Sequence, residues 1–339
     1  MKKIIACFCC CYLCFIFPAH AQRLEVLTSG QIKSIRGLSV VNDQVFWVSG
    51  TEGTVGKTTN GGRTWEWYRV PGCDSLDWRD IEAFDDSKAI VVNAGEPANI
   101  YLTRDGGKNW RRVYFNNTKG IFLDAMAFIN EDEGLIIGDP LKGKVTVLQT
   151  KDGGYEWKQL KLNNKAKTAD GEAFFAASGT CLRAIPNTKM YAFVSGGKTA
   201  NLYILRNTNI TAKRALPMIQ GESSQGPFSI ATWDRKHFVI TGGNYMLDTS
   251  TYQNCVTTKD GGKHFTAPVL PPGGYRSAVE YISKDLLVST GTSGTDLSFD
   301  GGKTWKNISR DSYNCARKAK DGTIVILAGV NGKVARLAL

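Results

Sequence analysis

The residues of this chain best suited to chemistry are carboxylates and arginines that recur at intervals of about one structural repeat. Two carboxylates at a suitable separation can act as general acid and general base in the hydrolysis of a glycosidic bond. Carboxylates, guanidiniums and amides that converge can instead hold a charged ligand. The candidates are Arg36, Arg79, Asp80, Asp124, Glu172, Tyr275, Arg276 and Asn314.

A repeated motif indicates which elements must position these residues. The stretch "TRDGGKNW", which begins at Thr103, returns as "TTNGGRTW" at 58, "TKDGGYEW" at 150, "TKDGGKHF" at 258 and "SFDGGKTW" at 298. One interval is double, and within it "NLYILRNTNIT" near Leu205 matches as a worn copy. A period of about 40 to 50 residues is typical of the blades of a β-propeller.

A second marker counts the blades independently. A β-rich run that ends in glycine and is followed by a short loop and another strand occurs seven times, from "FWVSGTEGTVGKT" to the terminal "VILAGVNGKVARLAL". The segment "RLEVLTS" near the start resembles the strand that follows each motif. We therefore predict an all-β, seven-bladed propeller over residues 22–339, closed by pairing of its first and last strands, which removes a sheet edge.

The repeated motif is better suited to a turn than to catalysis. Asp105 can accept hydrogen bonds from turn amides, the two glycines permit backbone angles that a side chain resists, and Trp110 begins the next strand as an apolar anchor. A turn tolerates the Asn and Phe that stand in two copies, whereas a catalytic carboxylate would not. The predicted structural positions are Asn60, Trp65, Asp105, Trp110, Asp152, Trp157, Asp260, Phe265, Asp300 and Trp305.

At these residues the sequence resembles the Asp-box repeat, S/T-x-D-x-G-x-x-W/F, of sialidases, other glycoside hydrolases, sortilin-type receptors and photosystem II stability/assembly factors. With seven blades and segments such as "GEAFFAASGTCL", the chain most resembles the assembly-factor family and its exported bacterial relatives. This resemblance implies a non-enzymatic propeller that binds a partner. The sequence has no G-x-G-x-x-G loop after a strand and no cluster of metal ligands, so we expect neither a cofactor nor a metal.

The topology of a blade predicts where the candidate residues meet. The innermost strands begin on the face that carries the links between blades and the loops between second and third strands. Aligning the seven copies places at this channel mouth Arg36, Asp80, Asp124, Glu172, Phe228, Arg276 and Asn314, flanked by Arg79 and Tyr275. We expect this channel-mouth face to bind a protein partner, a glycan or a small anionic ligand. The alternative is that the two arginines only neutralise the three carboxylates around a water-filled channel.

An enzyme remains the second hypothesis, as a glycoside hydrolase of the sialidase type. The resemblance would then require three arginines and a tyrosine with its glutamate, for which Arg36, Arg79, Arg276, Tyr275 and Glu280 supply the residue types. The "FRIP" segment typical of sialidases is absent, and their catalytic ring has six blades. We therefore favour binding over catalysis.

Two insertions depart from the repeat. The stretch from Tyr245 to Asn254 lengthens a loop of blade five on the channel-mouth face, where long loops often make contacts. The stretch from Ser178 to Asn187 is expected to enlarge the opposite face of blade four.

The first 21 residues, "MKKIIACFCCCYLCFIFPAHA", have the pattern of a secretory signal peptide cleaved near Ala21. We therefore expect an exported monomer, periplasmic or extracellular, without a transmembrane segment in the mature chain. Five of the nine cysteines lie in this leader; Cys73, Cys181, Cys255 and Cys315 remain, and a bridge from Cys181 to Cys255 is one open possibility. The net charge of +11 is scattered, so we expect no nucleic-acid partner.

Overall fold

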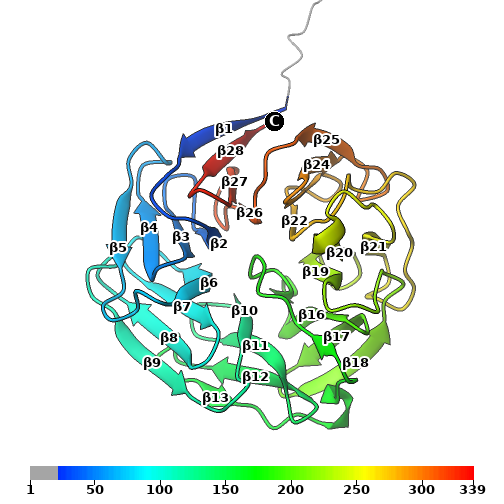
Figure 1. Cartoon of the computed structure of the whole chain (residues 1–339), viewed down its shortest axis with the longest axis horizontal. Helices are drawn as coiled ribbons and strands as arrows, with labels where there is room; N and C mark the ends of the chain where they lie inside the picture. Colours follow the sequence, from blue (N-terminus) through cyan, green and yellow to red (C-terminus); the bar gives the residue numbers. More distant parts are fainter. Residues whose placement is uncertain (1–21) are drawn as a thin grey trace, which may run out of the picture.

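The computed structural model describes residues 22–339 as a closed ring of seven antiparallel sheets (Figure 1). The predicted all-β propeller with seven blades is confirmed. The predicted signal peptide lies outside the described residues. Within residues 22–339, no helix has the length and hydropathy needed to cross a membrane.

The first three blades are regular four-stranded sheets whose strands follow the chain from the channel outward. Blade one consists of β2 (Ile35–Val40), β3 (Phe46–Gly50), β4 (Thr54–Thr58) and β5 (Glu66–Arg69). Blade two consists of β6 (Asp77–Ala83), β7 (Ala89–Ala94), β8 (Ala98–Thr103) and β9 (Arg111–Asn116). Blade three consists of β10 (Leu123–Phe128), β11 (Gly134–Leu141), β12 (Lys144–Thr150) and β13 (Lys158–Gln159).

Blades four and five depart from this pattern. Blade four has a split inner strand and consists of β14 (Glu172–Ala173), β15 (Leu182–Ala184), β16 (Met190–Gly197), β17 (Asn201–Arg206) and β18 (Asn209–Ala215), preceded by the 3-10 helix η1 (Asn164–Ala166). Blade five consists of β19 (Gln225–Thr232), β20 (Phe238–Asn244) and β21 (Cys255–Thr258), with the 3-10 helix η2 (Tyr245–Leu247) after β20.

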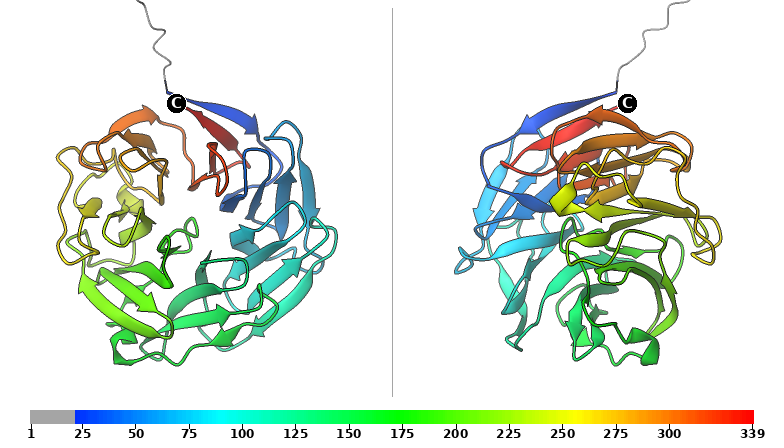
Figure 2. Two further views of the ribbon diagram at one scale, coloured as in Figure 1. Left: turned by 180° about the vertical axis from the view of Figure 1, so that it is seen from behind. Right: turned by 45° about the vertical axis from the view of Figure 1, so that its right-hand side comes forward.

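The last blade joins the two ends of the described chain. Blade six consists of β22 (Ala278–Tyr281), β23 (Leu287–Gly291), β24 (Gly294–Ser298) and β25 (Lys306–Ser309). Blade seven consists of β26 (Cys315–Lys318), β27 (Val325–Ala328), β28 (Val334–Ala338) and β1 (Arg23–Thr28). Strand β1 pairs antiparallel with β28, with Arg23 opposite Ala338, so the predicted closure is confirmed (Figure 2).

Apolar side chains between neighbouring blades form the core. Between blades one and seven, Ile35 and Phe46 pack with Ile326 and Val334, all of them buried. Strand β3, "FWVSG", is buried along its whole length because neighbouring blades cover both of its faces. Burial of this kind is the main favourable contribution to folding.

Each Asp-box turn is tied to the hairpin beside it. Asp105 Oδ1 accepts a hydrogen bond from the Asn109 amide at 2.9 Å, and Trp110 Nε1 donates to the Gly107 carbonyl at 3.0 Å. The Gly106 amide donates to the Ser87 carbonyl, in the turn between the first two strands of the blade. The hydrogen bond from a turn amide to the Asp or Asn side-chain oxygen recurs in all five copies, whereas the indole hydrogen bond recurs in four, because Phe265 replaces the tryptophan in the copy at 258. These contacts account for the repeated residues as parts of a turn. In the worn copy, Asn207, with a φ of 53°, makes a tight turn between β17 and β18 instead.

A segment of blade four enters the central channel. Between β14 and β15 the chain leaves the sheet, and Figures 1 and 2 show this green loop projecting into the ring. We call residues 174–181 the plug. The Ser178 hydroxyl donates to the Ser277 carbonyl of blade six at 2.6 Å, and Arg317 of blade seven donates to the Ser178 carbonyl at 3.3 Å. The expectation that Ser178 to Asn187 enlarges the opposite face is therefore wrong for the first residues of this stretch.

The four cysteines of the described chain are buried, unpaired thiols. Cys181 packs in the core around blade four, whereas Cys255 packs with Val279 and Trp305 between blades five and six. A bridge from Cys181 to Cys255 is therefore excluded, because the two thiols face different clusters.

Candidate functional site

The plug divides the channel into two cavities. One, of about 480 Å³, opens where the innermost strands begin and is lined by Arg36, Arg79, Phe122, Asp139, residues 173–177, Phe228, Tyr245, Tyr275, Thr292 and Asn314. We call it the mouth pocket. The other, of about 290 Å³, opens where the innermost strands end, and we call it the base cavity. Ser178 and Thr180 lie fully buried between the two.

β-Bulges occupy equivalent positions in four blades, and three of the four bulge residues, Arg36, Arg79 and Phe228, line the mouth pocket. The register of the two inner strands shifts at Arg36, Arg79, Asp124 and Phe228. A bulge leaves its extra residue unpaired and redirects its side chain, and bulges are common beside functional sites. The bulge of blade two falls on Arg79, so the sequence alignment, which placed Asp80 at this position, was wrong by one residue.

One wall of the mouth pocket is aromatic. The rings of Phe175 and Phe228 stack with centroids 3.8 Å apart, and Tyr275 meets Phe228 edge to face at 4.8 Å. Tyr245, from η2, contacts both Phe228 and Tyr275 and is 46% exposed. This wall offers aromatic surface to an apolar group.

The facing wall is basic. Arg36 Nη1 donates to the Ala177 carbonyl at 3.2 Å, and Arg79 Nη1 donates to the Ala176 carbonyl at 3.0 Å. Arg79 also pairs with Asp77 at 2.6 Å, whereas no carboxylate of residues 22–339 lies within 4.0 Å of the Arg36 guanidinium. Burial, and then the charge of Arg79, lower the pKa of Arg36. A guanidinium stays protonated in proteins, so Arg36 is a cation without a paired anion.

Asp139 is the carboxylate that lines the mouth pocket, and it was not among the residues predicted from the sequence. Its Oδ1 accepts the Phe174 amide at 2.8 Å and so holds the start of the plug. Burial raises the pKa of Asp139. The extra residues between β14 and β15, which include "FFAASGT", are the sequence signal from which the plug could have been predicted, but they do not identify Asp139.

Arg36, Arg79, Tyr275 and Asn314 line the mouth pocket, as the sequence predicted for the channel mouth. Asn314 Nδ2 donates to the Ile35 carbonyl at 2.8 Å, so this amide also joins blade seven to blade one. Asp80, Asp124, Glu172 and Arg276 line neither cavity. The prediction that these four residues present their side chains at the channel mouth is therefore wrong.

Asp80 and Asp124 are buried inside the ring of inner strands. The oxygens of Asp80 accept the amides of Ile81 at 2.9 Å and Met126 at 2.7 Å, and burial raises the pKa of Asp80 to about 7. Among the described residues neither oxygen of Asp124 has a hydrogen-bond partner. Burial, and then repulsion from Asp139, raise the pKa of Asp124 well above its usual value. Both carboxyls therefore face protein rather than a ligand.

Glu172 points into its own blade rather than into the channel. Its carboxylate accepts from the Ser195 hydroxyl at 2.6 Å and the Asn201 amide at 3.0 Å, and it pairs with Lys213 at 3.1 Å. Glu172 and these three partners all belong to the sheet of blade four. Glu172 therefore stabilises blade four.

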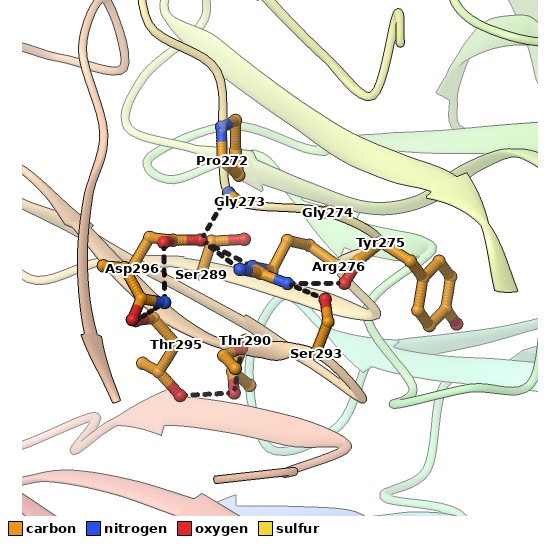
Figure 3. A network of polar contacts seen from close by, with 12 residues as sticks. Pro272, Gly273, Gly274, Tyr275, Arg276, Ser289, Thr290, Ser293, Thr295 and Asp296 are labelled. Carbon is orange, nitrogen blue, oxygen red and sulfur yellow. Dashed lines mark hydrogen bonds and ion pairs between the residues drawn. The ribbon is translucent and has the colours of Figure 1, made fainter. Parts of the chain in front are cut away.

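Arg276 lies beneath the channel mouth and is fully buried. It pairs with Asp296 of the same blade at 2.6 Å and donates to the Tyr275 carbonyl and the Ser293 hydroxyl at 2.8 and 2.7 Å (Figure 3). The neutralisation hypothesis is also wrong, because neither Arg36 nor Arg276 forms an ion pair with any of the three predicted carboxylates.

The five residues proposed for a glycoside hydrolase do not all meet in one cavity: Arg36, Arg79 and Tyr275 line the mouth pocket, but Arg276 and Glu280 do not. Tyr275 lines the mouth pocket, whereas Glu280 lines the base cavity on the other side of the plug. Arg276 is enclosed with Asp296. Across residues 22–339, no group of three His, Cys, Asp or Glu side chains is arranged to hold a metal ion. The tyrosine and glutamate of a sialidase-like site therefore do not share a cavity.

Comparisons with known proteins agree with this architecture. The family model described as Photosynthesis system II assembly factor YCF48 matches residues 79–173. No curated protein matches the sequence.

Solved structures match nearly the whole chain. A structure of YCF48 bound to a D1 peptide has 14% sequence identity and a TM-score of 0.67, covering 95% of this chain and 96% of that one. YCF48 from Cyanidioschyzon merolae has 16% identity and a TM-score of 0.65, covering 94% and 98%. The WD40 β-propeller domain of Doa1 has 12% identity and a TM-score of 0.64, covering 93% and 97%. The chain is thus a seven-bladed, Asp-box β-propeller that resembles the YCF48 assembly-factor family, most specifically in blades two and three.

Proposed function

We propose that this chain is an exported, non-enzymatic propeller that binds a segment of a protein partner in the mouth pocket. The observation that carries the proposal is the union, in one pocket, of an unpaired cation and an aromatic wall. Arg36 supplies the cation, and Phe228, Tyr245 and Tyr275 supply the wall. Specific binding sites commonly combine apolar surface with a few placed polar groups.

The side chains that line the mouth pocket indicate which residues the partner segment should carry. An acidic side chain would offset the charge of Arg36, and an aromatic or large aliphatic side chain would pack on the aromatic wall. Met246 and Leu247, which follow Tyr245 in η2, are 71% and 64% exposed and offer further apolar surface. Exposed apolar surface at a polar rim is typical of an interaction site.

Two further observations support a protein partner in an exported compartment. A YCF48 structure with the same fold is bound to a D1 peptide. The leader "MKKIIACFCCCYLCFIFPAHA" has a basic start, an apolar run and an A-x-A exit. Sequencing of the amino terminus of the protein isolated from its host should find a start near Gln22, and a chain that retains Met1 would contradict export.

Fluorescence anisotropy with two synthetic peptides tests the site. The peptides differ only at their centres, where one carries adjacent Phe and Glu and the other adjacent Phe and Lys. We expect the Glu peptide to bind more tightly and its affinity to fall as salt is added, because charge attraction contributes. Arg36→Gln should weaken this binding about tenfold or more, since a desolvated cation is lost.

The matched control is Arg235→Gln, which removes the same charge from an exposed turn of blade five at the other end of the blade. It should bind the Glu peptide like the unaltered protein. Equal affinity for the two peptides, or binding by Arg36→Gln equal to that of Arg235→Gln, would remove the mouth pocket as the proposed site.

A further inference from the structure

The base cavity differs in chemistry from the mouth pocket. It lies at the other end of the channel, where β2, β6, β10, β15, β22 and β26 end. Its charged lining residues are Glu82, Arg183, Glu280, Arg317, Lys318 and Lys320. Four cations and two carboxylates leave this cavity with an excess of positive charge.

Both carboxylates of the base cavity are already paired. Arg183 donates to Glu280 at 2.5 Å, and the two side chains are only 19% and 17% exposed. Lys320 pairs with Glu82 across the blades. Lys318 donates to the Gly322 carbonyl at 3.0 Å. The remaining cation, Arg317, has no carboxylate within 4.0 Å in the described part of the chain.

The guanidinium of Arg317 is poorly compensated. Its Nη2 donates to the Ser178 carbonyl of the plug at 3.3 Å, and its Nη1 is buried without a hydrogen-bond partner among the described residues. Asp80 and Glu280 attract it at longer range, but the oxygens of Asp80 accept backbone amides and Glu280 is paired with Arg183. A buried, unpaired charge is costly unless another group offsets it.

A second guanidinium adds to the imbalance. Burial, and then repulsion from Arg183, lower the pKa of Arg317. Two arginines that repel one another and line one cavity create a positive potential that an anion would offset, and guanidiniums form strong, directional hydrogen bonds with oxyanions. The volume of about 290 Å³ has room for a small anion with several waters, which occupy roughly 30 Å³ each.

We propose that the base cavity binds a small oxyanion, of the phosphate or carboxylate class, between Arg317 and Arg183. Lys320, 45% exposed at the opening of the cavity, contributes further positive charge. The site is separate from the mouth pocket, because Ser178 and Thr180 of the plug stand buried between them. An anion there would also hold the plug, since Arg317 already donates to it.

Titration calorimetry at constant ionic strength tests this site, with inorganic phosphate in one arm and malonate in the other. We expect the protein to bind at least one of the two, and the arm that binds identifies the class. Arg317→Gln should weaken that binding about tenfold or more. Arg235→Gln and Arg36→Gln, which alter an exposed turn and the mouth pocket, should leave it unchanged.

Thermal unfolding gives a second readout, because the melting temperature of each protein can be compared with and without the anion. Without the anion, Arg317→Gln should melt at or above the temperature of the unaltered protein, because the substitution removes an uncompensated charge. With the anion, only proteins that retain Arg317 should gain stability. Failure of both anions to bind, or equal binding to Arg317→Gln, would overturn the proposal, and neither result depends on the mouth pocket.

Discussion

The Asp-box turns and the mouth pocket lie at opposite ends of the blades and use their residues in opposite ways. In the turns, different copies make the same contacts: Asp105 accepts the Asn109 amide and Asp300 accepts the Thr304 amide, each at 2.9 Å. At the mouth, equivalent bulge positions hold Arg36, Asp124 and Phe228, which do unlike things. Repetition therefore builds the ring, and departures from repetition give it a site.

The largest loss of stability is expected for Arg276, which lies beneath the channel mouth and does not line the mouth pocket. Arg276→Ala leaves Asp296 as a buried, unpaired charge, and should cost about 3 to 5 kcal/mol of unfolding free energy. Urea denaturation measures this loss. The double variant Arg276→Met, Asp296→Leu removes both charges and should recover part of it. A loss under about 1 kcal/mol for the single variant would mean that Arg276 is not a structural residue.

A nearly equal loss of stability is expected when Trp305 of an Asp-box turn is replaced. The ring of Trp305 is 7% exposed and packs between blades, so Trp305→Ala should cost about 3 to 5 kcal/mol. Trp110 occupies the same position in its copy but is only partly buried, so Trp110→Ala should cost less. Urea denaturation of the two variants measures how much each tryptophan stabilises its turn. Equal stability of both variants and the unaltered protein would contradict a structural role of the turns.

A smaller loss of stability is expected for a substitution in the plug, Gly179→Ala, for which Gly143→Ala is the matched control. Gly179 has a φ of 67°, and a Cβ there would lie 2.3 Å from the Asp80 carboxyl. Gly179→Ala should therefore cost more than the roughly 1 to 3 kcal/mol of backbone strain alone. Gly143 has a φ of 70° with nothing within 4 Å of a Cβ, so Gly143→Ala reports the strain without the clash. Equal melting temperatures for the two variants would show that the plug does not pack tightly on Asp80.

The pH dependence of stability tests the burial of Asp80. Its pKa is about 7 in the folded chain against 3.8 in a free side chain, because burial disfavours the charge. Between these values the folded state binds a proton that the unfolded state releases, so stability falls as pH rises from about 4 to 7. The contribution is at most about 1.4 kcal/mol per pH unit. Asp80→Asn should flatten the slope, and an unchanged slope would contradict the burial of this carboxyl.

The fold could be predicted because its signals repeat along the chain. Five motif copies and seven glycine-ended strands gave the blade count, and the likeness of "RLEVLTS" to the outer strands gave the closure. The site was predicted only in part. Arg36, Arg79, Tyr275 and Asn314 line the mouth pocket, but a β-bulge has no sequence marker, and the alignment therefore took Asp80 for the channel-facing residue of blade two.

The remaining errors have a common physical cause. The partner of Arg276 is Asp296, 20 residues away on β24, and nothing in the local pattern distinguishes that carboxyl from the channel carboxylates. Each of the contacts from the plug to blades one, six and seven joins a side chain to a backbone carbonyl, and the carbonyl partner carries no sequence information. Long-range contacts of single residues decide which side chains reach the pocket, whereas short repeats decide the fold.

Peptide binding and stability should be measured together in one pair of variants, Arg36→Gln at the mouth and Trp305→Ala in an Asp-box. For Arg36→Gln we predict an unfolding free energy within about 0.5 kcal/mol of that of the unaltered protein. Its affinity for the Glu peptide should be reduced about tenfold or more. For Trp305→Ala we predict the reverse, with stability lost and the affinity of the folded fraction retained. Lost affinity in folded Trp305→Ala, with full affinity in Arg36→Gln, would contradict the division between a ring built by repeats and a site built by departures from them.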